Sequence, residues 1–282
     1  MNMVGVIDSH VHVASADTTT YPLHTTGVGS EWYRNGDVES DHLVATMDGH
    51  GVARAVVVQA IGAYGFDCRY ARDAAARHPD RLVFVGAIDM RRPDPSDELA
   101  RLAAPGDLRG VRLFGVGGAD TSWLTDGRAA DVWKRARAVG TTIVVVLWTA
   151  DLLRLRPLVE AAPDVPVAID HAGFPDLSGG LEGPSLTPLL SLADLPSVHL
   201  KLSSHLLVDA VAAGIEPSLL IDLLAERFGP ERLIWGSDYP QTQSLTYGEM
   251  LDLAHRAARH LSEASRTAFF GANAARLWWG EP

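Results

Sequence analysis

The sequence predicts a distorted (β/α)8 barrel, an α/β fold, in one domain that spans residues 1–282. Three observations support this prediction. Eight short apolar runs alternate with helical patterns, and the runs are rich in β-branched residues, as in a parallel sheet covered on both faces. No glycine-rich G-x-G-x-x-G turn follows the first run, although an open doubly wound sheet, the structural alternative, favours one.

The predicted strands are short and spread along the whole chain. They are residues 4–13, 54–59, 82–88, 110–114, 142–147, 165–169, 198–202 and 233–236. Segment 14–37 follows the first strand, so in a barrel it lies at the carboxyl-terminal face, where active sites form. Because long irregular loops in compact domains are often functional, we expect this segment to be a cap or lid.

Two helices have clear boundaries. One ends at Gly140, a residue type that commonly stops a helix, and the other begins at Pro217 and ends at Gly229. The apolar residues of the first are Val132, Trp133, Ala136 and Val139, and those of the second are Leu219, Leu220, Leu223, Leu224 and Phe228.

Composition excludes several classes of protein. The net charge of −11 argues against a nucleic-acid partner, because nucleic-acid binding favours basic surfaces. No run of about 18 apolar residues suggests a membrane span, and no basic segment followed by an apolar one suggests a secretory signal. Cys68 is the only cysteine, so an internal disulfide is excluded and a reducing cytoplasm is expected. The expected partner is a small-molecule substrate, and nothing in the sequence marks an oligomer interface.

Polar residues at strand ends form a candidate site. His10 and His12 stand two apart in the first strand, so they point to the same face and could bind a metal or a substrate carbonyl. His171 follows the sixth strand, and Asp238 follows the eighth. Strand ends converge in a barrel, so these four residues are the candidate catalytic group.

Six further residues are candidate substrate contacts because they lie at or near strand ends. They are Gln59, Tyr64, Arg112, Trp148, Lys201 and Ser203. Arg112 lies in an apolar run, which indicates a bound anion or a buried ion pair. Lys201 could instead pair with Asp8 or Asp170, and Gln59 and Trp148 could be packing residues.

Three motifs carry a resemblance to a known family. They are Asp8-Ser9-His10-Val11-His12, Ile169-Asp170-His171-Ala172-Gly173-Phe174-Pro175 and Trp235-Gly236-Ser237-Asp238-Tyr239-Pro240. In this order they resemble the amidohydrolase superfamily, specifically its amidohydrolase 2 branch of lactonases and 2-pyrone-4,6-dicarboxylate hydrolases.

The resemblance implies a hydrolase that opens a lactone or similar cyclic ester of a small carboxylated or sugar-derived substrate. Asp238 would activate water, and His171 would polarise the carbonyl. His10 and His12 would bind metal or hold the substrate. Two alternatives remain open: a metal-dependent decarboxylase of an aromatic or muconate-type acid, and a non-catalytic binding protein.

Two residues that metal-dependent members of the family commonly have are missing from this chain. Metal-dependent members commonly carry a histidine at the end of the fifth strand, where this chain has Leu147 and Trp148. Arg112 stands where binuclear members have a bridging lysine on the fourth strand. We therefore expect no required cofactor. The alternative is one divalent metal such as Zn²⁺, held by His10, His12 and Asp238.

Overall fold

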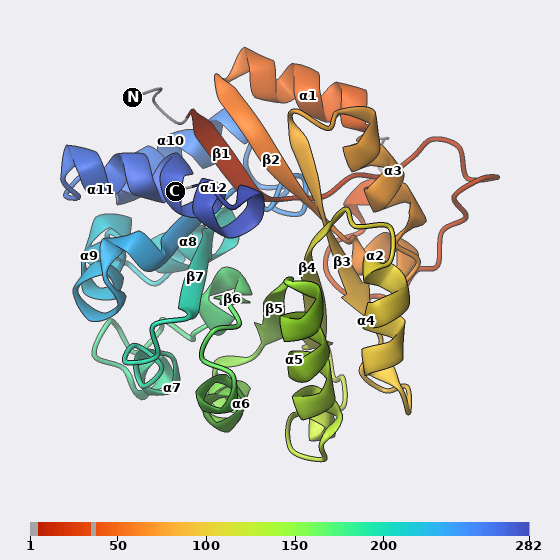
Figure 1. The fold of residues 1–282 in the computed structure, drawn as a ribbon. Helices are drawn as coiled ribbons and strands as arrows, with labels where there is room; N and C mark the ends of the chain where they lie inside the picture. The colour runs from red at the N-terminus through yellow and green to blue at the C-terminus, as the bar shows by residue number, and fades with distance from the viewer. Residues whose placement is uncertain (1–4, 35–37, 282) are drawn as a thin grey trace.

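The strands form a parallel barrel whose order follows the chain. In the computed structural model, which describes residues 5–34 and 38–281, eight strands are hydrogen-bonded in the order β1 to β8 (Figure 1). They are β1 (Val6–Val11), β2 (Val52–Val58), β3 (Leu82–Ile88), β4 (Leu108–Gly115), β5 (Thr142–Leu147), β6 (Val167–Ile169), β7 (Val198–Ser203) and β8 (Leu233–Gly236). Neighbouring strands are parallel, as in β1 with β2 and β7 with β8. The predicted (β/α)8 barrel is confirmed.

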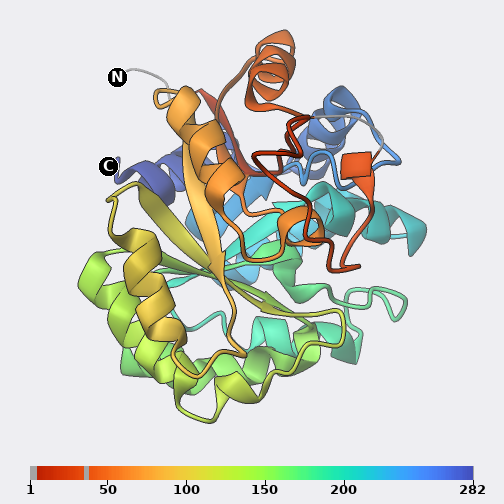
Figure 2. The same ribbon diagram turned by 90° about the vertical axis from the view of Figure 1, so that its right-hand side faces the viewer.

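Helices surround the strands (Figures 1 and 2). They are α1 (Ser40–Gly49), α2 (Ile61–Tyr64), α3 (Arg69–Arg77), α4 (Pro95–Ala103), α5 (Arg128–Val139), α6 (Arg156–Ala161), α7 (Thr187–Leu190), α8 (Ser204–Ala212), α9 (Pro217–Phe228), α10 (Tyr247–Ala257), α11 (Glu263–Thr267) and α12 (Asn273–Trp279). The predicted stops at Gly140 and Gly229 are confirmed, and Pro217 begins α9. Within the described residues, no helix is long and apolar enough to cross a membrane.

Three predicted strands have the observed bounds, and the others differ at their ends. The strand predicted at 4–13 is shorter, from Val6 to Val11, and residue 4 lies outside the described residues. The strand predicted at 165–169 begins only at Val167. The reason is Pro166, which has no N–H group to donate to a neighbouring strand.

Side chains help to close the seam between β1 and β8. The Asp8 carboxylate accepts hydrogen bonds from the Ser237 backbone N–H at 2.8 Å and from the Tyr247 hydroxyl at 3.0 Å. The Ser9 hydroxyl donates to the Trp235 carbonyl at 2.6 Å. All three bonds join the start of the chain to its end. They hold the first and the last strand of the barrel together.

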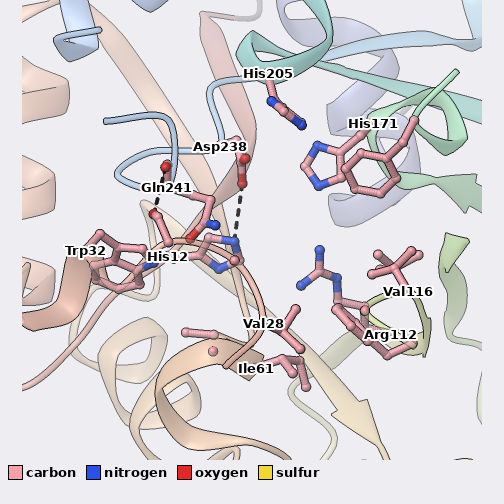
Figure 3. Close-up of a pocket in the computed structure, with 18 of the residues that line it drawn as sticks. His12, Val28, Trp32, Ile61, Arg112, Val116, His171, His205, Asp238 and Gln241 are labelled. Atoms are coloured by element: carbon pink, nitrogen blue, oxygen red, sulfur yellow. Dashed lines mark hydrogen bonds and ion pairs between the residues drawn. The ribbon is translucent and has the colours of Figure 1, made fainter. Parts of the chain in front are cut away.

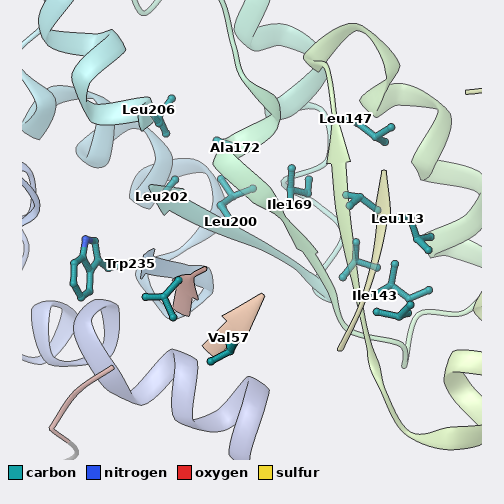
Figure 4. Close-up of a cluster of buried hydrophobic side chains, with 14 of the residues drawn as sticks. Val57, Leu113, Ile143, Leu147, Ile169, Ala172, Leu200, Leu202, Leu206 and Trp235 are labelled. Atoms are coloured by element: carbon teal, nitrogen blue, oxygen red, sulfur yellow. The ribbon is translucent and has the colours of Figure 1, made fainter. Parts of the chain in front are cut away.

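The apolar core has two layers separated by the strands. One layer lies between strands and helices, and Figure 4 shows part of it, including Val57, Leu113, Ile143, Leu200 and Trp235. Alternate positions of the same strands point into the barrel. These inner residues include Val56, Val58, Val85, Val144, Ala168 and Ile234. This alternation is the period-two pattern of a strand with both faces covered.

Helix α12 closes one end of the barrel, and the opposite end carries the segment after β1 (Figure 2). Trp278 of α12 belongs to the inner core layer and is 1% exposed. Gly110 on β4 leaves room for it, because a Cβ atom at that position would lie 2.8 Å from the Trp278 ring. Trp278 is therefore the floor of the barrel.

We expect Trp278→Ala to lower the free energy of unfolding by about 3–5 kcal/mol, because it leaves a cavity in a closed interior. Urea unfolding followed by circular dichroism measures this change. Trp279→Ala is the matched control, since Trp279 is only partly buried on the same helix. Equal losses in the two variants would contradict the role of Trp278 as the floor.

Candidate active site

A cavity of about 470 Å³ opens at the carboxyl ends of the strands (Figure 3). Its walls include His12, Arg112, Trp148, His171 and Asp238, which come from five different strand ends. The segment after β1 contributes Gly27, Val28, Gly29, Ser30 and Trp32, so this part of the predicted 14–37 cap borders the cavity. Residues 35–37 of that segment lie outside the described residues.

His10, His12 and Asp238 form a close cluster across the β1–β8 seam. The two Nε2 atoms of the histidines are 3.2 Å apart. Oδ1 of Asp238 lies 3.5 Å from Nε2 of His10 and 3.4 Å from Nε2 of His12. Backbone bonds fix this arrangement, because Asp238 N–H donates to the His10 carbonyl at 2.9 Å. His12 and Asp238 border the cavity, with His10 buried behind them.

Asp238 is ionised and held in an uncommon backbone conformation. Its φ of 61° is in the left-handed region, where a residue other than glycine is under strain of about 1–3 kcal/mol. Burial favours a higher pKa for its carboxyl group. The neighbouring imidazoles, first His171 and then His12 and His10, outweigh burial, so the pKa lies well below its ordinary value. A charged carboxylate therefore faces the cavity at neutral pH.

His171 is a neutral imidazole on the opposite wall. It lies in a short 3-10 turn, Asp170–Gly173, and has a φ of 55°. Burial lowers its pKa from 6.5 to about 4. Nδ1 lies 2.7 Å from the Ser203 hydroxyl oxygen. When that hydroxyl donates to Nδ1, the single ring proton lies on Nε2 and is available to a ligand.

Asp170 organises the cations beneath the cavity. One of its oxygens lies 2.9 Å from Nζ of Lys201, and the other accepts from Nε of Arg112 at 2.8 Å. His10 Nδ1 lies 3.4 Å from Asp170. Burial opposes ionisation of Asp170, but Lys201 and its other neighbours outweigh burial and lower its pKa well below the usual range. Arg112 keeps its terminal nitrogens toward the cavity (Figure 3).

Four predicted substrate contacts lie outside this cavity and have internal partners. The Gln59 amide donates to the carbonyls of Gly65 and Asp67 at 2.8 and 3.1 Å. The Tyr64 hydroxyl accepts from the Ser15 N–H. Lys201 pairs with Asp170, and Ser203 contacts His171. Arg112 and Trp148 do border the cavity.

The sequence did not single out several residues that the structure places at the cavity. His205 borders it from the start of α8 with 45% of its side chain exposed. Its position directly after the seventh strand could have indicated this. Phe174, Gln241 and Thr242 also border the cavity, and each follows a predicted catalytic residue by a few positions.

The cluster of His10, His12 and Asp238 fits one divalent ion. Tetrahedral zinc with ligand bonds of about 2.0–2.1 Å requires donor atoms roughly 3.3–3.4 Å apart, close to the spacing of His10, His12 and Asp238. Nδ1 of His12 lies 2.9 Å from the Val58 carbonyl, so this nitrogen carries the proton and Nε2 is free to bind metal.

A second donor group does not offer an equivalent site. His10, Asp170 and His171 also lie within metal-binding distance of one another. The oxygens of Asp170, however, already face Lys201 and Arg112. A metal ion beside these two cations would be repelled, so this group of described residues does not suit an ion.

Comparison with known proteins places the chain in a family. The amidohydrolase family model matches residues 7–279. The chain belongs to this family. It is 29% identical to an L-fucono-1,5-lactonase from Burkholderia ambifaria, over 96% of this chain and 94% of that protein.

Solved amidohydrolase structures resemble it over the same length. One from Pseudomonas putida, described as a candidate 2-pyrone-4,6-dicarboxylic acid hydrolase, is 26% identical with a TM-score of 0.82 and full coverage, 100% of both chains. An amidohydrolase from Burkholderia multivorans with bound zinc is 25% identical with a TM-score of 0.76, over 98% of this chain and 99% of that one.

We expect the purified amidohydrolase to bind about one equivalent of Zn²⁺ and no more, since only one of the donor sets among the described residues is free of protein cations. Isothermal titration of chelator-treated protein measures the stoichiometry. His12→Ala should abolish binding, and His205→Ala, a cavity residue outside the donor set, should retain it. Two equivalents in the wild type, or full binding by His12→Ala, would contradict this assignment.

Proposed function

We propose that this amidohydrolase opens a lactone or similar cyclic ester with water activated by Asp238. One observation carries the proposal: an ionised carboxylate faces a neutral imidazole and a guanidinium across one cavity. A base on one side and groups that stabilise negative charge on the other are what ester hydrolysis requires. The name of the B. ambifaria lactonase supports the same chemistry.

The proposed reaction conserves atoms and charge. Asp238 takes a proton from water while the water oxygen forms a bond to the lactone carbonyl carbon. Negative charge develops on the carbonyl oxygen, where Nε2 of His171 and the terminal nitrogens of Arg112 stabilise it. The ring C–O bond then breaks, and the leaving oxygen takes the proton from Asp238. The product is a hydroxy acid.

The metal is an optional part of this proposal. A divalent ion such as Zn²⁺ held by His10, His12 and Asp238 would act as a Lewis acid toward water. Asp238 contacts both histidines through Oδ1, which leaves its second oxygen for the water molecule. His10 and His12 orient the carboxylate in either case.

We also propose a cytoplasmic location, for which the supporting observation is Cys68. This cysteine is buried and unpaired. Burial raises the pKa of its thiol to about 12, so the thiol stays protonated. A protonated, buried cysteine is compatible with a reducing compartment and has no part in the proposed reaction.

We expect Asp238→Asn to lower kcat for lactone hydrolysis by about 10²–10⁴, because asparagine has a similar shape but cannot accept a proton from water. A pH-indicator assay of acid release measures turnover, and thermal melting verifies the fold. The control is Asp80→Asn, which changes an exposed carboxylate. Carbon dioxide release would instead favour the decarboxylase, and ligand binding without turnover would favour the binding protein.

The pH profile should reflect the low pKa of His171. Because the neutral ring is the proposed active form and its pKa is about 4, kcat/KM should stay level from about pH 7 to about pH 5. Below this range, protonation of His171 should reduce it. Circular dichroism at each pH separates this loss from unfolding. An acid limb centred near the ordinary imidazole value of 6.5 would contradict the assignment.

A further inference from the structure

The cavity has a polar end and an end that is mainly apolar apart from Arg112 (Figure 3). His12, Asp238, Gln241 and Thr242 form the polar end. The remaining walls are mainly apolar and include Val28, Ile61, Phe114, Val116, Val146 and Trp148, with the Arg112 guanidinium among them and His171 and His205 beside them. The polar end holds the proposed reacting groups, so a bound ring has its carbonyl there and its substituents against the apolar walls.

The apolar end is a packed surface. Ile61, Val116 and Val146 are 4%, 6% and 1% exposed, so they are held firmly by their surroundings. Val28, in the segment after β1, covers this end of the cavity. It packs against Gly117, because a Cβ atom at that position would lie 3.3 Å from the Val28 side chain. A hydroxyl group placed against these walls would lose its hydrogen bonds to water without replacement.

Aromatic rings continue the apolar wall to the mouth of the cavity. Trp148 is 47% exposed there, which is unusual for so large an apolar side chain. Its ring lies 5.2 Å from that of Phe174, which in turn lies 4.6 Å from His171. A flat or extended apolar group that leaves the reacting centre would therefore meet aromatic surface along its path.

The charge at the cavity limits the number of carboxylates on the substrate. Among the described residues that border it, Arg112 is the only lysine or arginine, and Asp170 already binds its Nε. Nη1 also donates to the Gln59 carbonyl at 3.5 Å, so the side of the guanidinium that faces the cavity suits one carboxylate or the developing oxyanion. A second carboxylate would find no lysine or arginine on the described walls and would be repelled by Asp238.

Given the lactonase activity proposed above, we propose that the substrate is a lactone with an apolar alkyl or unsaturated substituent and at most one carboxylate. The apolar wall, defined as Val28, Ile61, Phe114, Val116, Val146 and Trp148, binds the substituent. Of the two substrate types expected from the sequence, this proposal keeps a small substrate with one carboxylate and departs from the sugar-derived one.

Four six-membered lactones test this substrate class. δ-Valerolactone has no substituent, δ-decalactone carries a pentyl chain, D-glucono-δ-lactone carries hydroxyl groups, and 2-pyrone-4,6-dicarboxylate carries two carboxylates. We expect kcat/KM for δ-decalactone to exceed that for δ-valerolactone by about tenfold or more, as buried methylene groups are worth roughly tenfold or more in specificity. The hydroxylated and dianionic lactones should be the poorest substrates.

A matched pair of variants tests the wall itself. Val116→Thr keeps the side-chain shape and replaces one methyl group with a hydroxyl, so the δ-decalactone to δ-valerolactone ratio should fall by about fivefold or more. Val139→Thr makes the same change at a 40% exposed position on α5 and should leave the ratio unchanged.

The outcomes separate this inference from the proposed function. If the wild type hydrolyses none of the four lactones, the proposed function fails. If it prefers the hydroxylated or dianionic lactone, or treats δ-decalactone and δ-valerolactone alike, lactonase activity stands and the substrate class is overturned. An unchanged ratio in Val116→Thr, or an equal fall in Val139→Thr, also overturns it.

Discussion

The buried charge of Asp170 is the interaction on which the rest of the site depends. A carboxylate with no solvent contact is costly unless cations and hydrogen bonds surround it, and Lys201 and Arg112 supply both. The same contacts orient the Arg112 guanidinium toward the cavity and place Asp170 beside His10. Lys201 also lies 5.6 Å from the Trp278 ring. A continuous set of contacts thus joins Trp278, at the closed end of the barrel, to the residues of the site through Lys201 and Asp170.

These contacts limit where a metal ion can bind in the barrel. Lys201 and Arg112 are paired with Asp170. Among the described residues, His10, His12 and Asp238 are therefore the donor group that remains for an ion. The Asp238 carboxylate is ionised because neighbouring imidazoles lower its pKa, and the His171 imidazole is neutral because burial lowers its pKa. Both residues have left-handed backbone conformations, a strain that recurs at functional sites because the surroundings impose it.

The sequence predicted the barrel, its strand order and the four candidate catalytic residues, because periodicity and strand ends are local signals. The sequence does not show how far along the barrel axis a side chain lies, because that position depends on contacts between strands distant in sequence. Lys201 points inward as predicted for a site residue, but it lies two residues before the end of β7 and therefore below the cavity. Gln59 stands at a strand end, yet the chain turns back through α2 and provides carbonyl partners for its amide. His205 was not selected from the sequence because it lies at the start of a helix and does not end a strand.

The seam between β1 and β8 has a consequence for the order of folding. Its bonds join residues 226 and 239 positions apart in sequence, from Ser9 to Trp235 and from Asp8 to Tyr247. Contacts of such separation form late, because a long loop must close before they are gained. During synthesis, β1 leaves the ribosome long before its partner exists. His10 and His12 meet Asp238 only after nearly the whole chain has been made, so an incomplete chain cannot assemble the water-activating cluster.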